Sequence, residues 1–446
     1  MTRSEIDNDA GRVELSPHSG ETEEAPEGGA FYRTYVLTLL CFGFFLSYAD
    51  RQVIGVLLTP IKQEFALSDT ELGLMSGLVF GIFYSIVSLP LAYVSDRGSR
   101  KVVLTVSLAL WSLATMTAGL AASAGHLVAS RTLVAVGEAG GTPASISAIS
   151  DMYPPEQRGM PIGLYNAAGS IGGAVVLTLG AWLATSYGWR SAFIVVGAPG
   201  LFLALLLLTT MREPQRGVQD GQGDLGPPPT FMETLRCLWR QPILLLGILG
   251  GAASSGVVTC LIWFPSLFER SHQLSLLQAG GAVGIGLLVS GPFGEIIGGQ
   301  INDRAGRRST ARTLYAVMGI TLATILMGVA VVLSPTATMA IALMIVWKVL
   351  ATVWVPPTWA LSQALVEPRM RATSQATMGL TGNLLGYGGG TALAGWLSEA
   401  YRPAMGEESL RWALVTVFLL VGLLAATAYF FAARLAARQE LVAAGA

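Results

Sequence analysis

The sequence predicts an all-α membrane protein with twelve transmembrane helices in two six-helix halves and with both termini in the cytoplasm. Of its 446 residues, 52% are hydrophobic and only 12% are charged, whereas charged residues make up about 25% of an ordinary globular protein. The apolar residues occur in blocks of about 20 residues or more, which is the length that a helix needs to cross a bilayer. These observations exclude a soluble protein and indicate a multi-pass integral membrane protein.

Twelve apolar blocks, each bounded by charged or turn residues, give the predicted spans. They cover residues 33–60, 69–95, 102–122, 125–150, 159–183, 188–211, 242–267, 274–301, 311–333, 337–362, 372–399 and 411–433. Ser68 and Glu71 have the spacing of a capping box at the start of the second span.

The distribution of Lys and Arg predicts the orientation. If alternate loops lie on opposite sides of the membrane, and residues at span edges are counted with the loops, nineteen of these residues fall on the side of the N-terminus and five on the other side, while three lie in the interior of spans. Cytoplasmic loops carry the excess of positive charge, so we expect both termini in the cytoplasm. No N-glycosylation sequon is present, and a bacterial inner membrane fits best.

Composition also predicts the domain boundaries. Residues 1–30 hold eight acids against two arginines, and we expect a disordered cytosolic tail there. The longest polar interruption, 213–241, contains three consecutive prolines and a short amphipathic stretch and reads as a cytosolic linker. It separates an N-terminal six-helix bundle, 31–212, from a C-terminal one, 242–438, which is followed by a tail at 439–446.

A charged motif repeats at equivalent places in the two halves. Ala92-x-x-x-Asp96-Arg97-x-Ser99-Arg100-Lys101 follows the second span, and Gly299-x-x-x-Asp303-Arg304-x-Gly306-Arg307-Arg308 follows the eighth. A repeat separated by about half the chain is typical of transporters built from two similar halves.

This motif, with twelve spans and a central cytosolic loop, resembles the loop motif of the major facilitator superfamily. The resemblance implies that the loop aspartate contacts the N-terminus of a helix in the opposite half and holds the cytoplasmic side shut, which helix-dipole physics makes reasonable. The implied gate residues are Asp96, Arg97, Arg100, Asp303, Arg304 and Arg307. The alternative is a charge cluster that only sets the topology.

A narrower resemblance involves Tyr48-Ala49-Asp50-Arg51-Gln52 in the first span and Arg131 to Gly137-Glu138-Ala139 in the fourth. These segments are similar to the spinster-like branch of the superfamily, although Ala135 stands where the branch has glycine. This resemblance implies a lysophospholipid or a sphingoid-lipid phosphate as the substrate.

Charged residues inside the membrane are costly to bury, so they are functional candidates by default. Asp50 and Arg131 lie at similar depth, and Glu138 lies two turns from Arg131 on the same helix face. In the superfamily, helices one and four line the central cavity, which would bring Asp50 and Arg51 near Arg131 and Glu138. Burial favours a neutral carboxyl group and a nearby guanidinium favours the charged form. A motion that separates them would therefore couple protonation to conformation, unless the cluster is a fixed ion-pair network.

Lys348 is the one cation in the interior of the predicted spans of the C-terminal half, where other basic residues stand only at span edges. It either pairs with Glu295, extends towards the membrane surface, or faces the cavity and contacts an anionic headgroup of the substrate.

Other function classes lack their motifs. No lysine follows a glycine, so the phosphate loop of an ATP-driven pump is absent. The three histidines lie in the N-terminal tail, at the outer edge of the fourth span and in an outer loop, and no G-x-S-x-G sequence occurs, so we expect neither an enzyme nor a metal or other cofactor. The near-zero net charge gives no reason to expect nucleic-acid binding.

These observations together predict a monomeric secondary active transporter that moves an organic, amphiphilic lipid-like substrate by alternating access. We expect proton coupling, with sodium as the competing ion. The alternative is a multidrug or small-metabolite proton antiporter.

Overall fold

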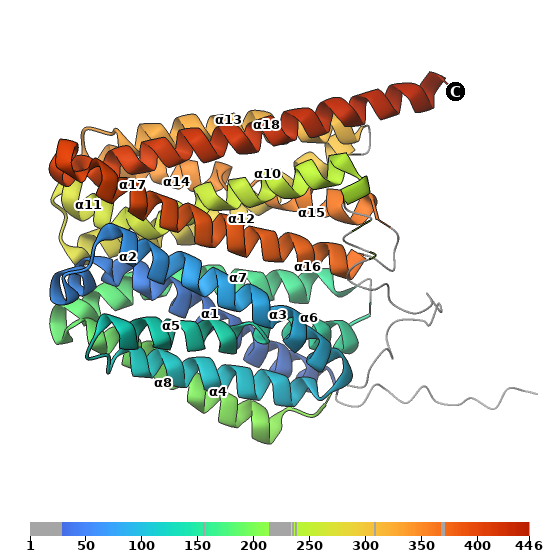
Figure 1. Ribbon diagram of the computed structural model, residues 1–446. Coiled ribbons are helices and arrows are strands. Elements are labelled where there is room, and N and C mark those ends of the chain that lie inside the picture. Colours follow the sequence, from blue (N-terminus) through green and yellow to red (C-terminus); the bar gives the residue numbers. More distant parts are fainter. Residues whose placement is uncertain are drawn as a thin grey trace, which may run out of the picture.

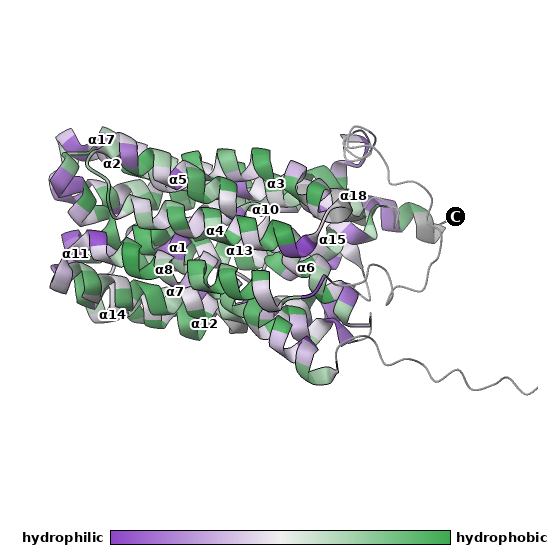
Figure 2. Cartoon of the chain, turned by 90° about the horizontal axis from the view of Figure 1, so that it is seen from below, coloured by the Kyte–Doolittle hydropathy of each residue, from purple (hydrophilic) through white to green (hydrophobic). Residues whose placement is uncertain are grey.

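The computed structural model describes residues 29–154, 157–213, 239–306, 309–366 and 371–445, together with Glu233 and Arg236. In these residues the chain is helical and has no strand, and the long helices run side by side in one bundle (Figure 1). Hydrophobic residues cover the middle of the bundle and hydrophilic residues gather towards its two ends (Figure 2). This distribution is the one that a helical bundle needs in a bilayer.

The N-terminal half contains these helical elements: α1 (Ala30–Phe65), α2 (Asp69–Gly73), the π-helical turn η1 (Leu74–Leu78), α3 (Val79–Arg97), α4 (Arg100–Ala118), α5 (Ala124–Glu138), α6 (Gly141–Met152), α7 (Gly159–Tyr187) and α8 (Trp189–Thr210). The predicted capping box is present, because Ser68 accepts from the Glu71 backbone and Glu71 accepts from the Ser68 backbone.

The C-terminal half contains α10 (Pro242–Thr259), η3 (Cys260–Trp263), α11 (Phe264–His272), α12 (Leu276–Gly306), α13 (Thr310–Val332), α14 (Ala337–Leu350), α15 (Val355–Ala364), α16 (Arg371–Thr381), the π-helical turn η5 (Gly382–Gly388), α17 (Gly389–Met405), η6 (Gly406–Glu408) and α18 (Ser409–Gly445). Helix α18 continues through the predicted C-terminal tail as far as Gly445.

Ten helical stretches among the described residues are long and apolar enough to cross a membrane. One of them, Thr377–Val442, includes most of the predicted span 372–399 and all of the predicted span 411–433. The predicted span 125–150 falls on α5 and α6, which are separately shorter than a membrane-spanning helix. All twelve predicted spans therefore lie on helical structure, and twelve crossings stay a prediction. The predicted N-terminal tail, 1–30, and the predicted linker, 213–241, lie largely outside the described residues.

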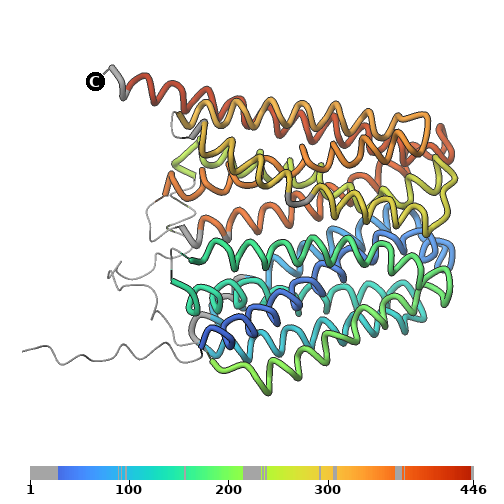
Figure 3. Tube along the Cα trace, turned by 180° about the vertical axis from the view of Figure 1, so that it is seen from behind, coloured from blue at the N-terminus to red at the C-terminus, as the bar shows by residue number. Residues whose placement is uncertain are grey.

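The beginning of α1 and the end of α18 lie at the same end of the bundle (Figure 3). We call this the terminal end and the other the opposite end. The orientation in a membrane, with the terminal end in the cytoplasm, stays a prediction.

The two halves approach closely along two seams. Between α7 and α12, a Cβ atom at Gly284 would lie 2.6 Å from the Ala174 carbonyl oxygen. Between η1 and the η5–α17 segment, a Cβ atom at Gly77 would lie 2.6 Å from Thr391 Cβ of α17 and 3.2 Å from the Gly388 carbonyl oxygen of η5. π-Helical turns widen a helix locally and are frequent at functional sites, and these two turns face each other across the halves.

Candidate functional site

Two buried ion pairs lie inside the N-terminal half, and α1 contributes to both. Arg131 of α5 donates from Nη1 to Asp50 Oδ2 at 3.1 Å. Arg51 donates from Nε to Glu138 Oε2 at 2.5 Å. Asp50, Arg131 and Glu138 are 1%, 0% and 2% exposed. The structure thus brings together the four residues predicted to cluster, with each acid bound by a base from the other helix.

Local helix geometry explains this pairing. Neighbouring residues on a helix point about 100° apart, so Asp50 and Arg51 reach different partners. Arg131 and Glu138 are seven residues apart and share a face of α5. Gly137 allows that helix to lie against α4, because a Cβ atom there would be 2.6 Å from the Trp111 backbone nitrogen. Helix α5 ends at Glu138, so the acid lies at a break in the predicted span.

Two hydroxyl groups hold the carboxylates in place. Thr115 donates to Asp50 Oδ1 at 2.7 Å, and Ser47 donates to Glu138 Oε2 at 3.0 Å. Each carboxylate therefore has both a guanidinium and a hydroxyl partner.

Aromatic rings cover the Arg51 guanidinium. Its central carbon lies 5.0 Å from the centre of the Phe80 ring and 4.7 Å from that of Tyr84. These distances fit cation–π contacts. Phe80 also packs against Tyr387 of the other half, with ring centres 5.7 Å apart. The cluster therefore lies next to the interface between the halves.

The cluster is incompletely satisfied. Glu138 Oε1 and the Nε and Nη2 atoms of Arg131 are buried and have no hydrogen-bond partner in the described part of the chain. An unpaired buried polar group costs about 1–3 kcal/mol, so such atoms in a native structure require an explanation. One carboxylate oxygen of Glu138 is thus open to a proton or to a ligand.

Lys348 and Glu295, which the sequence allowed to pair, form no direct ion pair between their side chains. Lys348 of α14 is 7% exposed. It interacts electrostatically with Glu295. Among the described residues, no carboxylate oxygen lies within 4.0 Å of its amino group. Lys348 is therefore a buried cation that no carboxylate contacts directly in this state.

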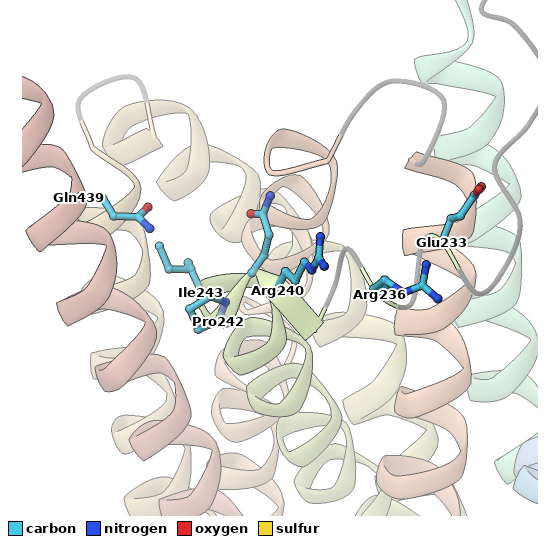
Figure 4. A pocket seen from close by; sticks show the side chains of 7 residues that line it. Glu233, Arg236, Arg240, Pro242, Ile243 and Gln439 are labelled. Atoms are coloured by element: carbon cyan, nitrogen blue, oxygen red, sulfur yellow. The ribbon is translucent and has the colours of Figure 1, made fainter.

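A cavity of about 660 Å³ at the terminal end lies outside this cluster (Figure 4). It is formed by the beginning of α10, by Gln439 of α18 and by the polar residues Glu233, Arg236 and Arg240. Arg236 and Arg240 are exposed, so the cavity is a polar surface pocket, and we do not assign the transported substrate to it.

The first copy of the repeated motif makes its described contacts within one half. Arg100 forms an ion pair with Asp151 at the end of α6. Glu213, which the sequence reasoning missed, accepts from the Ser99 hydroxyl at 2.5 Å and from the Arg100 backbone at 2.7 Å. A carboxylate at a helix N-terminus is stabilised by the helix dipole. The side chains of Asp96 and Arg97 lie outside the described residues.

The second copy has a corresponding arrangement. Glu440 of α18 accepts from the Ser309 hydroxyl at 2.6 Å and from the Ala311 backbone at 3.2 Å. Asp303 and Arg304 are exposed, and no ion pair or hydrogen bond of the Asp303 side chain is found among the described residues. Arg307 lies outside them. The gate role of these residues stays a prediction.

A polar cluster at the opposite end was not predicted. Asp69, at the start of α2, is 1% exposed. It is bound by Arg270 of α11 at 2.7 and 2.8 Å, by Lys62 at 2.5 Å and by the Ser398 hydroxyl of α17 at 2.6 Å. Arg270 and Ser398 belong to the other half, so this cluster joins the halves.

A match to a protein family agrees with the fold. The sequence profile of the Major Facilitator Superfamily matches residues 40–391, which is well over half of the chain and includes parts of both halves. The chain belongs to the Major Facilitator Superfamily. The sequence-based resemblance is confirmed, and this fold and family are those of membrane transporters of small molecules.

Solved structures and sequence relatives support the spinster-like resemblance. A bacterial homologue of the human lysosomal transporter spinster, solved in an inward-facing, unoccupied conformation, matches 92% of this chain and 99% of its own with a TM-score of 0.83 at 30% identity. The Drosophila melanogaster protein spinster is 26% identical over 82% of this chain and 62% of its own length. An efflux pump of the superfamily from Mycolicibacterium smegmatis is 31% identical over 87% of this chain and 89% of its own.

Proposed function

We propose that this transporter moves an amphiphilic, lipid-like substrate across a bacterial inner membrane by alternating access, coupled to protons at Glu138. The observation that carries the proposal is the pair of buried ion pairs, Asp50 with Arg131 and Arg51 with Glu138, beside the interface between the halves. Glu138 supports the proton coupling, the contacts at the two ends of the bundle support the alternating access, and an apolar groove supports the substrate class.

Glu138 supports proton coupling. Its carboxylate is almost fully buried, has one free oxygen and depends on Arg51 for its charge balance. When α1 moves relative to α5, Arg51 leaves the carboxylate, and an isolated buried carboxylate favours the protonated form. Proton uptake at Glu138 and movement of α1 are then linked.

The two ends of the bundle support alternating access. Asp69 and Arg270 join the halves at the opposite end, while the exposed Asp303 makes no described contact across the halves at the terminal end. This combination fits an inward-facing state in which the opposite end is latched. The cycle then requires the Asp69 cluster to open.

The lipid-like substrate class is supported by an apolar groove of about 440 Å³ between α7 and α12. The groove lies where the two halves meet, and its exposed apolar side chains would face lipid. It is lined by Ala174, Val175, Thr178, Leu179, Trp182, Gly284, Ile285 and Leu288. An apolar surface of this kind suits an acyl chain. Lys348, which is not part of the groove lining, is the buried cation that we assign to an anionic headgroup.

Flux in proteoliposomes tests the proposal. Uptake of a fluorescent lysophospholipid should rise with an imposed proton gradient and should stay the same when sodium is replaced by choline. Glu138→Gln, which mimics a permanently protonated acid, should bind the lipid and lose the gradient dependence. Retained gradient-driven uptake in Glu138→Gln would disprove coupling at this residue.

A multidrug or small-metabolite proton antiporter is the second candidate, favoured by the identity to the mycobacterial efflux pump. The same vesicles separate the two. Under this alternative, a hydrophilic metabolite or a cationic drug exchanges for protons and lysophospholipid gives neither binding nor flux.

A further inference from the structure

A small cavity inside the N-terminal half is lined in part by Glu138, and Arg51 is not among the residues that line it. Helices α1, α4, α6, α7 and α8 surround it, and its polar lining consists of Ser47, Glu138, Thr142, Ser145 and Tyr165. Its volume is about 20 Å³, and one water molecule needs about 10–15 Å³ of such space. The cavity therefore has room for one water molecule.

The unpaired oxygen of Glu138 needs such a partner. Oε2 accepts from Arg51 and Ser47, whereas Oε1 is buried without a described partner. Ordered water commonly satisfies buried polar atoms that the protein leaves unpaired, provided that two or more polar groups surround it.

Hydroxyl groups provide the other partners. Thr142 and Ser145 are three residues apart on α6, so they share a face of that helix, and both line the cavity with Glu138. Tyr165 of α7 is 2% exposed, and it lines the cavity together with Thr142 and Ser145. The Tyr165 ring is fixed by stacking on Phe44, with ring centres 4.2 Å apart.

The other faces of Glu138 are occupied by charged and titratable groups. Arg51 covers the Oε2 side, and its guanidinium is itself covered by Phe80 and Tyr84. The groups that interact electrostatically with Glu138 from the surrounding elements are Tyr48, Asp50 and Arg51 of α1, Arg131 of α5 and Tyr387 of η5. In the cavity, by contrast, the polar groups next to Glu138 are neutral hydroxyl groups.

We propose that this cavity binds one water molecule, which passes the coupling proton to and from Glu138 Oε1 along the hydroxyls of Thr142, Ser145 and Tyr165. The inference rests on the proposed proton coupling at Glu138. On loading, an O–H bond of a hydronium ion in the cavity breaks, an O–H bond forms on Oε1, and a neutral water remains. On release the same bonds exchange in reverse. Each hydroxyl accepts one proton and gives up another, so none changes its net charge.

The test removes the hydroxyls and keeps the shape. Thr142→Val combined with Tyr165→Phe should slow proton-driven uptake by at least about tenfold. Exchange of labelled for unlabelled substrate needs no net proton transfer, so it should keep its wild-type rate. The hydrogen–deuterium exchange of the Glu138 carboxyl group, followed by infrared difference spectroscopy, should slow in parallel. Tyr165→Phe alone is the milder variant, for use if the double variant does not fold.

Matched controls are available in the C-terminal half. Tyr429 is buried and its hydroxyl contacts Thr358 at 3.2 Å, while the Thr321 hydroxyl donates to the Val317 backbone carbonyl at 2.9 Å. Tyr429→Phe with Thr321→Val should leave proton-driven uptake unchanged.

Two failures can be told apart. The relay is overturned if the Thr142→Val/Tyr165→Phe variant shows wild-type uptake and wild-type carboxyl exchange. The proposed coupling is left intact in that case if Glu138→Gln has lost its gradient dependence. Gradient-driven uptake in Glu138→Gln itself would overturn both. An equal slowing of uptake and of substrate exchange would also overturn the relay, because a packing defect slows both.

Discussion

Arg270 binds Asp69 through two hydrogen bonds that cross the interface between the two halves, Nη1 to Oδ2 at 2.7 Å and Nη2 to Oδ1 at 2.8 Å. The side chains are 14% and 1% exposed, so solvent screens this pair little. Lys62 and the Ser398 hydroxyl satisfy the same carboxylate. Opening the opposite end requires that Asp69 leave Arg270 and Ser398 together.

The first prediction concerns this latch. Asp69→Asn removes the carboxylate that both Lys62 and Arg270 bind, and removal of one partner from a buried pair typically costs about 3–5 kcal/mol. The closed opposite end should therefore become less populated. Spin labels at Leu120 and Met405, both exposed at this end, should give a longer distance in Asp69→Asn than in the parent.

Glu64→Gln is the control for this measurement. Glu64 also lies near the opposite end, but it pairs with Arg190 of the same half, and both side chains are about two-fifths exposed (40% and 38%). This variant should leave the label distance unchanged. An unchanged distance in Asp69→Asn as well would show that the cluster is not a latch.

The sequence predicted the capping box beside Asp69 but not the role of Asp69 itself. The local signal, Ser68 with Glu71, depends on residues three positions apart, whereas Arg270 is about two hundred positions away in the other half. Arg270 entered the sequence reasoning only as a charge that sets topology. Contacts between the halves depend on how two bundles pack, and one sequence carries no direct signal of that packing.

The intramembrane cluster was predictable for a different reason. A charge inside an apolar span is costly, so Asp50, Arg131 and Glu138 stand out without knowledge of the fold, and helix rise gives their depth. Which acid pairs with which base depends on the rotation of α1 and α5 about their axes, which only the structure supplies. The break after Glu138 was missed because hydrophobic periodicity continues through it.

Asp303 gives the second prediction. If it latches the terminal end in another state of the cycle, Asp303→Ala should shift the population further towards an open terminal end. Spin labels at Val102 and Leu441, both exposed, should report a larger fraction of long distances. Arg312→Ala removes a nearby exposed charge and should have no effect. Equal distance distributions in all three proteins would reduce the motif to a topology signal.

Lys348 gives the third prediction. If it contacts an anionic headgroup, Lys348→Gln should raise the KM for an anionic lysolipid by about tenfold or more, since a hydrogen bond to a charged group is worth about 1.5–3 kcal/mol. The KM for a zwitterionic lysolipid should change little, and Lys348→Arg should retain most of the affinity. Equal losses for both lipids would instead indicate that Lys348 stabilises the fold.

The last prediction concerns Asp50 and Arg131, which are paired inside one half at 3.1 Å. Neutralising one leaves the other charge buried and alone, so Asp50→Asn and Arg131→Met should each lower Tm and stop transport, while the double variant should recover Tm. If the pair breaks during the cycle, the double variant stays inactive because the switch is gone, whereas a rigid strut predicts that transport returns with stability. Thr115→Val removes the hydroxyl partner of Asp50 but keeps both charges, so it should retain proton-coupled flux. Wild-type flux in either single variant would exclude the pair from the mechanism.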